Sequence, residues 1–407
     1  MPKLKILINN KILIFTILTL GFIFWQARTP LWNQHLQVDI WVWFERMQYW
    51  FAHRSFAGLE GSEFLPATLL YLFIPTWLIP TGWFSYANYL PAALIINLVV
   101  VIGHLILVKN YAPVNRLPKF IFLLACFGPI LLFRFDALAT LTLIISLLFF
   151  SREKIGLSGF FLGLASAIKV YPVIFLPYLL LILWQKKALK SIVGLLIYFF
   201  EAIILSTLAF FALGGDYQQI LTALNFHNLK SISIESIPGS FLTAWSLLTT
   251  GQAPGLISGY GIWAIPGPAA LFNRLWVLPV AVIYLSLWQQ QLFKRFDWGV
   301  IFSLMLVFLV FSKNLNPQYA WWFLSLLPFV KTSRLVWLLA FGIAILNQLV
   351  YPVYYTWLLE EFYQQNRSYW VYYLLLLRNL LIIALAYLSL KTWYSPVSKT
   401  KGKLALK

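Results

Sequence analysis

Apolar runs recur along the whole chain and are separated by short polar stretches. A helical run of about 20 apolar residues crosses roughly 30 Å of hydrocarbon, whereas the shorter runs suit broken or re-entrant helices. We therefore predict an all-α integral membrane protein, a polytopic bundle of about 10–13 transmembrane or re-entrant helices. The runs lie at 6–25, 64–84, 87–108, 119–133, 137–150, 155–168, 170–184, 191–213, 237–250, 273–290, 298–312, 319–330, 335–351 and 370–390.

Composition agrees with this pattern. Of 407 residues, 61% are hydrophobic and 10% are charged, against roughly 25% charged in soluble domains, so a water-soluble globule is excluded. Neither an internal repeat nor a low-complexity tract is present. We expect one membrane-embedded domain over 1–407, with 26–63 as the first external loop and 391–407 as a short basic cytoplasmic tail.

The net charge is +18, from 30 Lys and Arg against 12 Asp and Glu. These basic residues lie in short runs between apolar segments, as the positive-inside rule predicts, and a nucleic-acid partner is not indicated. We expect a multi-pass protein in contact with membrane lipids, in the plasma (inner) membrane if the source is bacterial, with both termini cytoplasmic.

The run 6–25 is too long for a cleavable signal and is interpreted as a retained helix. The Pro-rich run 64–80 is expected to be partly re-entrant.

The segment 39–54 has apolar residues at helical spacing and charged residues on another face. It predicts an amphipathic helix at the outer interface. Asp39 opens this segment, and two interpretations remain open: the carboxylate caps the helix, or it faces a lipid head group and takes part in chemistry.

Three charged residues interrupt apolar stretches further along the chain. Charges at membrane depth mark buried pairs or functional sites. Arg134 and Asp136 either neutralise one another in a turn, or they contact a phosphate and a sugar. Lys169, followed by Tyr171, either extends to the surface or binds a lipid phosphate.

Two polar loops flank later apolar runs. One contains Glu235, and the other contains Lys313, Gln318 and Tyr319. Together they bring an acid, a lysine and an amide to one membrane face, as recognition of sugar hydroxyls and a phosphate requires. Interfacial tryptophans are interpreted as an aromatic belt, with sugar stacking as the alternative; they are Trp41, Trp43, Trp321 and Trp322.

The order of these motifs resembles the GT-C superfamily of polyprenyl-phosphate-sugar-dependent glycosyltransferases. The likeness is to bacterial polyprenyl-phosphate-mannose-dependent mannosyltransferases and to the catalytic subunit of the GPI mannosyltransferase. It covers about residues 10–330 and is most specific at the Lys-x-Tyr-Pro helix and the Asn-Pro-Gln-Tyr boundary. The motifs are EFLPATLLYLFIP, RFDALAT, AIKVYPVIFLPYLL, IESIPGS and FSKNLNPQYAWW.

The resemblance implies that Asp39 is the catalytic acid of the first loop. It also implies that four further residues match positions within the motifs of that family, with roles assigned here from their chemistry: Lys169, Glu235, Lys313 and Gln318. A divalent metal is the one cofactor that the resemblance leaves open, but the chain has one acid where some members have Asp-x-Asp, so no paired-acid motif supports it.

The expected function is transfer of a hexose, mannose by the resemblance, from a polyprenyl-phosphate sugar to a lipid-linked or glycan acceptor, with inversion at the outer face. The alternative is a transporter or flippase of a lipid-linked or small polar substrate. The lack of a visible two-fold repetition argues against that alternative.

Overall fold

Helices make up most of the structure, a computed structural model that describes residues 10–59, 63–80, 82–259, 261–289, 294–363 and 368–394. The helices are α1 (Asn10–Arg28), α2 (Pro30–His53), α3 (Pro66–Phe73), α4 (Tyr86–Tyr111), α5 (Leu117–Phe127), α6 (Asp136–Ser151), α7 (Ile155–Ile168), α8 (Leu176–Gln185), α9 (Leu189–Ala212), α10 (Tyr217–Leu229), α11 (Ile237–Thr250), α12 (Ala269–Leu275), α13 (Val277–Gln289), α14 (Trp298–Val310), α15 (Ala320–Leu324), α16 (Arg334–Gln348), α17 (Tyr355–Tyr363) and α18 (Trp370–Tyr394). A small antiparallel sheet, ordered β1-β3-β2, is formed by β1 (Ile232–Ser233), β2 (Ile257–Gly259) and β3 (Ile262–Ile265).

Within the described residues, seven helical segments are long and apolar enough to cross a membrane, and five shorter apolar segments accompany them. Seven and five give twelve, within the predicted range, and the all-α polytopic prediction is confirmed. The seven are Asn10–Arg28, Tyr86–Tyr111, Val114–Leu132, Leu189–Ala212, Ala269–Gln289, Arg334–Val353 and Trp370–Lys391; the five are Pro66–Leu78, Asp136–Ser151, Ile155–Ile168, Tyr171–Gln185 and Trp298–Val310.

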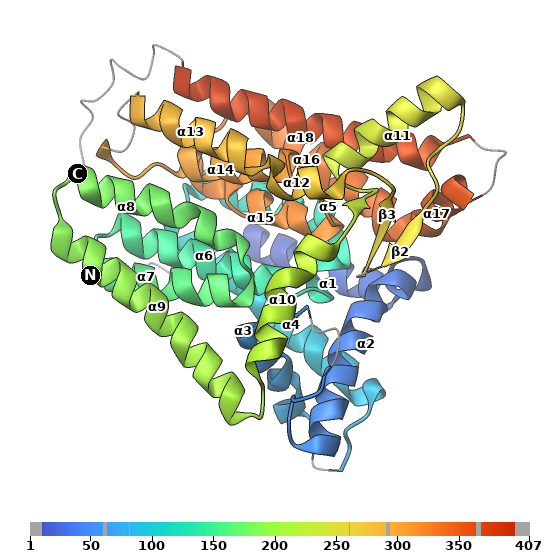
Figure 1. Cartoon of the computed structure of the whole chain (residues 1–407), viewed down its shortest axis with the longest axis horizontal. Coiled ribbons are helices and arrows are strands. Elements are labelled where there is room, and N and C mark those ends of the chain that lie inside the picture. The colour runs from blue at the N-terminus through green and yellow to red at the C-terminus, as the bar shows by residue number, and fades with distance from the viewer. Residues whose placement is uncertain are drawn as a thin grey trace.

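Close packing of α7 against α9 forms one side of the bundle, with α6 on the other flank of α7 (Figure 1). Gly159 and Gly163 make this approach possible, because a Cβ at either position would overlap the carbonyl oxygen of Leu195 or Phe199 on α9. Small residues one turn apart allow membrane helices to approach closely. The run of small residues in α7 therefore serves helix packing.

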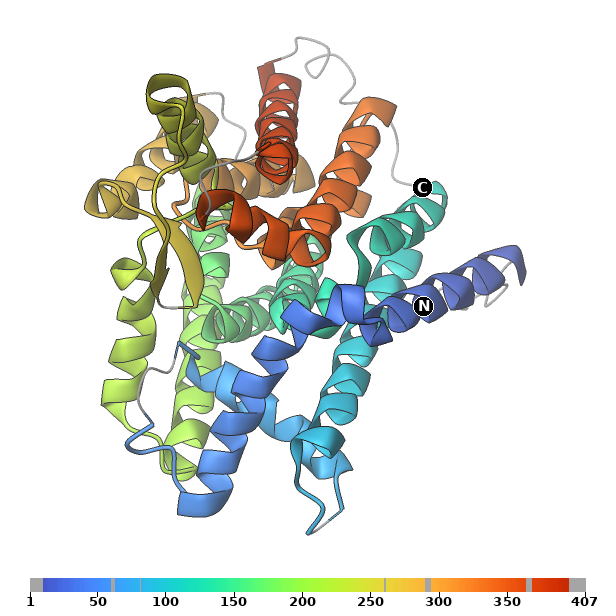
Figure 2. The ribbon, with the colours of Figure 1, turned by 90° about the vertical axis from the view of Figure 1, so that its right-hand side faces the viewer.

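A second group of helices is formed by α14 and α16, which both pack against α18. Helix α1 packs against α5 and projects from the edge of the bundle (Figure 2).

Helix α18 begins where the buried carboxylate of Glu361 accepts hydrogen bonds from the backbone N–H groups of Val371 and Tyr372, at 3.0 and 2.9 Å. This carboxylate satisfies donors that a helix start leaves unpaired.

The segments 26–63, 214–236 and 352–369 lie between apolar runs, and each contains a helix: α2, α10 and α17, respectively. The amphipathic helix expected at 39–54 is thus part of the longer α2. Helix α10 follows a capping box in which Asp216 and Gln219 bond reciprocally to each other's backbone N–H. Residues 1–9 and 395–407 lie outside the described residues, so only part of the predicted run at 6–25 and of the predicted tail at 391–407 is described.

Candidate active site

Asp39 lies on α2 and forms an ion pair with Arg134, which lies in the turn before α6. The Asp39 side chain is 37% exposed, whereas that of Arg134 is 10% exposed. Arg134 also donates from Nη2 to the hydroxyl of Tyr351 (2.8 Å), and Tyr351 donates to the backbone carbonyl of His35 (3.1 Å). A partly accessible carboxylate is thus held by a nearly buried guanidinium.

The interpretation of Asp39 as a helix cap is wrong. Helix α2 begins at Pro30, so Asp39 lies within the helix. Proline is well suited to the first helical turn, because its missing N–H has no intrahelical partner there. The idea that Arg134 and Asp136 neutralise one another is also wrong, because each has a different partner.

Asp136 is buried at the start of α6, and its Oδ1 accepts two hydrogen bonds. One comes from Lys169 Nζ at 2.6 Å and the other from Trp322 Nε1 at 2.8 Å. Lys169 follows the last residue of α7, and its side chain is 16% exposed. It therefore does not extend freely to the surface, because Asp136 holds its ammonium group inside.

Aromatic rings enclose the same lysine. Trp322 is stacked between Tyr171 and Tyr319, with ring centroids 3.9 and 4.0 Å apart. Lys169 Nζ lies 4.7 Å from the Tyr319 ring centroid and 5.2 Å from that of Trp322. Such cation–π contacts stabilise a desolvated ammonium. Trp43, Trp321 and Trp322 are buried in the core, so they do not form an aromatic belt, whereas Trp41 is exposed. Tyr171 and Tyr319 already cover both faces of the Trp322 ring, which leaves no face for a sugar.

Glu235 precedes α11 and is 4% exposed, and its Oε1 has no hydrogen-bond partner among the described residues. Its backbone carbonyl accepts from Arg378 and Asn379, both buried on α18. Ser236 caps α11 by accepting from the N–H of Gly239 at 3.0 Å. Burial raises the pKa of Glu235 to about 7, although Arg378 and Arg134 lie near enough to lower it.

Lys313 and Gln318 lie on the segment between α14 and α15. Lys313 Nζ donates to the backbone carbonyls of Asn228 (3.2 Å) and Lys230 at the end of α10. Gln318 is buried, and its Oε1 has no hydrogen-bond partner within the described residues. Two buried oxygens, on Glu235 and Gln318, are therefore available to a ligand.

Comparison with known proteins identifies the family. The family model for glycosyltransferase family 87 matches residues 66–312, more than half of the chain. The chain belongs to glycosyltransferase family 87. This is a family of GT-C type membrane glycosyltransferases, in agreement with the expected class. No curated protein matches the sequence.

The family 87 range contains Arg134, Asp136, Lys169 and Glu235 but not Asp39. Charges in different parts of the site lie close enough to interact. Arg134 repels the Lys169 ammonium and Glu63 attracts it, and Arg134 also attracts the Glu235 carboxylate. Two groups of predicted site residues are in direct contact: Asp39 with Arg134, and Asp136 with Lys169, Tyr171 and Tyr319 around Trp322. The segments of Glu235 and Lys313 are joined by a hydrogen bond from the backbone N–H of Ser233 to the carbonyl of Lys313 (3.0 Å), and Gln318 precedes Tyr319 in sequence.

Sequence reasoning did not single out several residues that lie at or beside the candidate site. Arg378 could have been found, because a charge within the apolar run 370–390 follows the same rule that identified Arg134. Tyr351, Lys230 and Glu63 gave no such signal, because their importance depends on which residues the fold brings beside them. Trp322 was expected only in an aromatic belt or in stacking on a sugar, not as a hydrogen-bond donor to Asp136.

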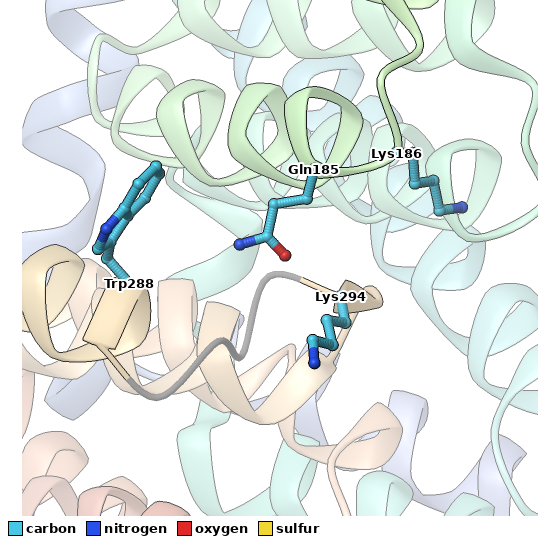
Figure 3. Close-up of a pocket in the computed structure, with 4 residues that line it drawn as sticks. All are labelled: Gln185, Lys186, Trp288 and Lys294. Atoms are coloured by element: carbon cyan, nitrogen blue, oxygen red, sulfur yellow. The ribbon is translucent and has the colours of Figure 1, made fainter.

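A cavity of about 420 Å³ lies elsewhere and is lined by Gln185, Lys186, Trp288 and Lys294 (Figure 3). Gln185 ends α8, whose other end follows the turn containing Tyr171. Ten helical residues span roughly 15 Å, so this cavity is separated from the candidate residues. Among the described residues, no group of three or more His, Cys, Asp or Glu side chains is arranged to hold a metal ion.

Proposed function

We propose that this glycosyltransferase moves a hexose, specifically mannose, from a polyprenyl-phosphate sugar to a lipid-linked or glycan acceptor at the outer membrane face. The single observation that carries the proposal is the Asp39–Arg134 pair: a partly exposed carboxylate is fixed beside a cluster of buried cations. Such an arrangement provides a base for an acceptor hydroxyl and positive charge for a departing phosphate.

In the proposed reaction, Asp39 accepts the proton of the acceptor hydroxyl. The hydroxyl oxygen attacks the anomeric carbon from the face opposite the phosphate, so the configuration is inverted. General-base assistance of this kind contributes about 10²–10⁴-fold to the rate. Arg134 orients the carboxylate through their ion pair, and Tyr351 holds the guanidinium in turn.

Lys169 is proposed to stabilise the negative charge that grows on the leaving phosphate. Asp136 is buried and already accepts bonds from Lys169 and Trp322, so we assign it to positioning the lysine rather than to contacting sugar. Tyr171 and Tyr319 fix Trp322 between their rings. The unpartnered oxygens of Glu235 and Gln318 are proposed to accept hydrogen bonds from sugar hydroxyls.

The decisive experiment compares two variants on the same helix. The Asp39→Asn variant preserves the size of the side chain and removes the base, and we expect transfer to fall by about 10²-fold or more. Glu45→Gln is the matched control, because Glu45 is exposed and, among the described residues, its side chain accepts a hydrogen bond from Trp41 one turn away and no other. Purified protein is incubated with labelled polyprenyl-phosphate mannose and a panel of acceptors, and the linkage is determined by NMR.

Undiminished transfer by folded Asp39→Asn protein would remove Asp39 from the mechanism. Transfer from another polyprenyl-phosphate sugar, but not from the mannose donor, would show that the donor sugar is not mannose and would leave the proposed mechanism unchanged. Movement of a lipid-linked substrate across vesicles without any transfer would instead support the transporter alternative.

A further inference from the structure

Lys230 is a buried cation that the proposed mechanism does not use. It follows the last residue of α10, is 6% exposed, and its Nζ lies 4.6 Å from the centroid of the Phe226 ring. Across the described part of the chain, no acceptor lies within hydrogen-bond distance of this ammonium and no acid forms an ion pair with it. A buried charge with only an aromatic face beside it is poorly compensated.

Lys313 brings a second positive charge to the same place. Its Nζ donates to the backbone carbonyl of Lys230, and within the described ranges it contacts no carboxylate. Arg134 and Lys169 differ in this respect, because each already has an acid as its partner. The Lys313 charge repels that of Lys230, and neither lysine has a direct counter-ion within the described residues, so an anion near both is favoured.

Glu63 is the acid that lies close enough to influence Lys230. Lys230, Arg46 and Lys169 each act on its charge, although burial outweighs them and raises the pKa of Glu63 above its usual value. Lys230 and Lys313 with one carboxylate leave one net positive charge. A single phosphodiester anion balances that charge, whereas a diphosphate exceeds it.

We propose that Lys230 and Lys313 bind the phosphate of the lipid-linked donor, and that Glu63 acts as the counter-ion that restricts the site to a phosphodiester. This assignment rests on the proposed function. In the reaction, the bond between the anomeric carbon and the phosphate oxygen breaks, and that oxygen keeps the electron pair. The sugar bonds to the acceptor oxygen, whose proton passes to Asp39. The lipid phosphate becomes a monoester with a second negative charge, which the ammonium groups of Lys230 and Lys313 stabilise together with that of Lys169.

The experiment measures binding without any sugar. Full-length protein in detergent is titrated with farnesyl methyl phosphate, which carries one charge, with farnesyl diphosphate, and with farnesol as the neutral reference. We expect Lys230→Met and Lys313→Met each to weaken binding of farnesyl methyl phosphate by about 10–100-fold, since hydrogen bonds between charged groups have that value. Lys190→Met is the control, because Lys190 is exposed on α9.

Two further variants test the geometry. Lys230→Arg retains the charge, and we expect binding within a few-fold of wild type, which shows that the methionine variant fails through charge and not through folding. Glu63→Gln removes the repulsion toward a second phosphate, so we expect affinity for farnesyl diphosphate to rise about 10-fold more than affinity for farnesyl methyl phosphate.

Different failures are distinguishable. If wild-type protein binds farnesyl methyl phosphate no better than farnesol, both the phosphate donor and this assignment are wrong. If binding is strong but Lys230→Met leaves it unchanged, only this assignment is overturned. If binding depends on both lysines while no sugar is transferred, the phosphate site is supported and the transferase chemistry fails. An unchanged preference in Glu63→Gln overturns the counter-ion role.

Discussion

Replacing Asp136 by leucine tests whether the buried ion pair positions Lys169. The substitution leaves the Lys169 ammonium inside without a counter-ion, which costs about 3–5 kcal/mol for a buried pair. It also leaves Trp322 Nε1 without an acceptor, at about 1–3 kcal/mol. Because the Asp136 carboxylate is 1% exposed, water does not replace it. We therefore expect the free energy of unfolding to fall by about 4–8 kcal/mol.

Lys169→Met leaves the opposite charge unpaired and is expected to cost about 3–5 kcal/mol. The double variant, Asp136→Leu with Lys169→Met, has neither charge, and only Trp322 Nε1 remains unsatisfied at about 1–3 kcal/mol. It is therefore expected to be more stable than Asp136→Leu by about 3–5 kcal/mol, the cost of the uncompensated lysine, and at least as stable as Lys169→Met. Sugar transfer should remain lost, because the phosphate no longer meets the Lys169 ammonium.

Unfolding is followed by circular dichroism during titration of dodecyl sulfate into mixed micelles, and transfer is measured on the same preparations. The control is Lys186→Met, which breaks the exposed pair with Glu153 (3.2 Å). That variant is expected to change stability by less than about 1 kcal/mol. A double variant no more stable than Asp136→Leu would refute the energetic reasoning, and recovered transfer would reduce the pair to a structural role.

Two further predictions concern the packing of α7 and the burial of Glu235. Gly163→Ala is expected to cost about 1–3 kcal/mol, because its Cβ overlaps the carbonyl of Phe199, whereas Gly194→Ala on α9 meets no atom and should be neutral or stabilising in the same unfolding assay. Burial raises the pKa of Glu235 from 4.5 to about 7, so the unfolded chain releases this proton at a lower pH than the folded chain does. Stability is expected to decrease by about 3 kcal/mol as the pH rises from about 4.5 to 7. An unfolding titration at several pH values should show this slope in wild type and lose it in Glu235→Gln; an equal slope in both would contradict the assignment.

Helix positions within the apolar runs could be predicted closely from sequence. The runs 155–168 and 237–250 coincide with α7 and α11, because an apolar segment bounded by polar residues has few alternatives in a membrane. The start of α2 could not be predicted. Residues 30–38 mix polar and apolar side chains without a continuous apolar run, and their helical state depends on burying Leu36 and Ile40 against the rest of the bundle.

The residue types of the site could also be predicted, but not their partners. Arg134 and Asp136 are neighbours in sequence, which suggested that they pair with each other. In the structure they lie on either side of the start of α6, and two residues of separation turn their side chains in different directions. Their partners, Asp39 and Lys169, are set by tertiary packing, which no local pattern encodes.

The candidate site includes residues that lie before and after the part of the chain that the family model matches, residues 66–312. Asp39 lies before residue 66, and Tyr351 and Arg378 lie after residue 312. Buried polar contacts join these outer segments to the centre: Arg134 requires both Asp39 and Tyr351, and Arg378 holds the backbone of Glu235. Because a buried charge without its partner costs several kcal/mol, docking of α2, α16 and α18 and correct orientation of Arg134 stabilise one another. The accessible carboxylate of Asp39 is consequently presented only when these helices are in place, so the proposed chemistry depends on the chain beyond the family range.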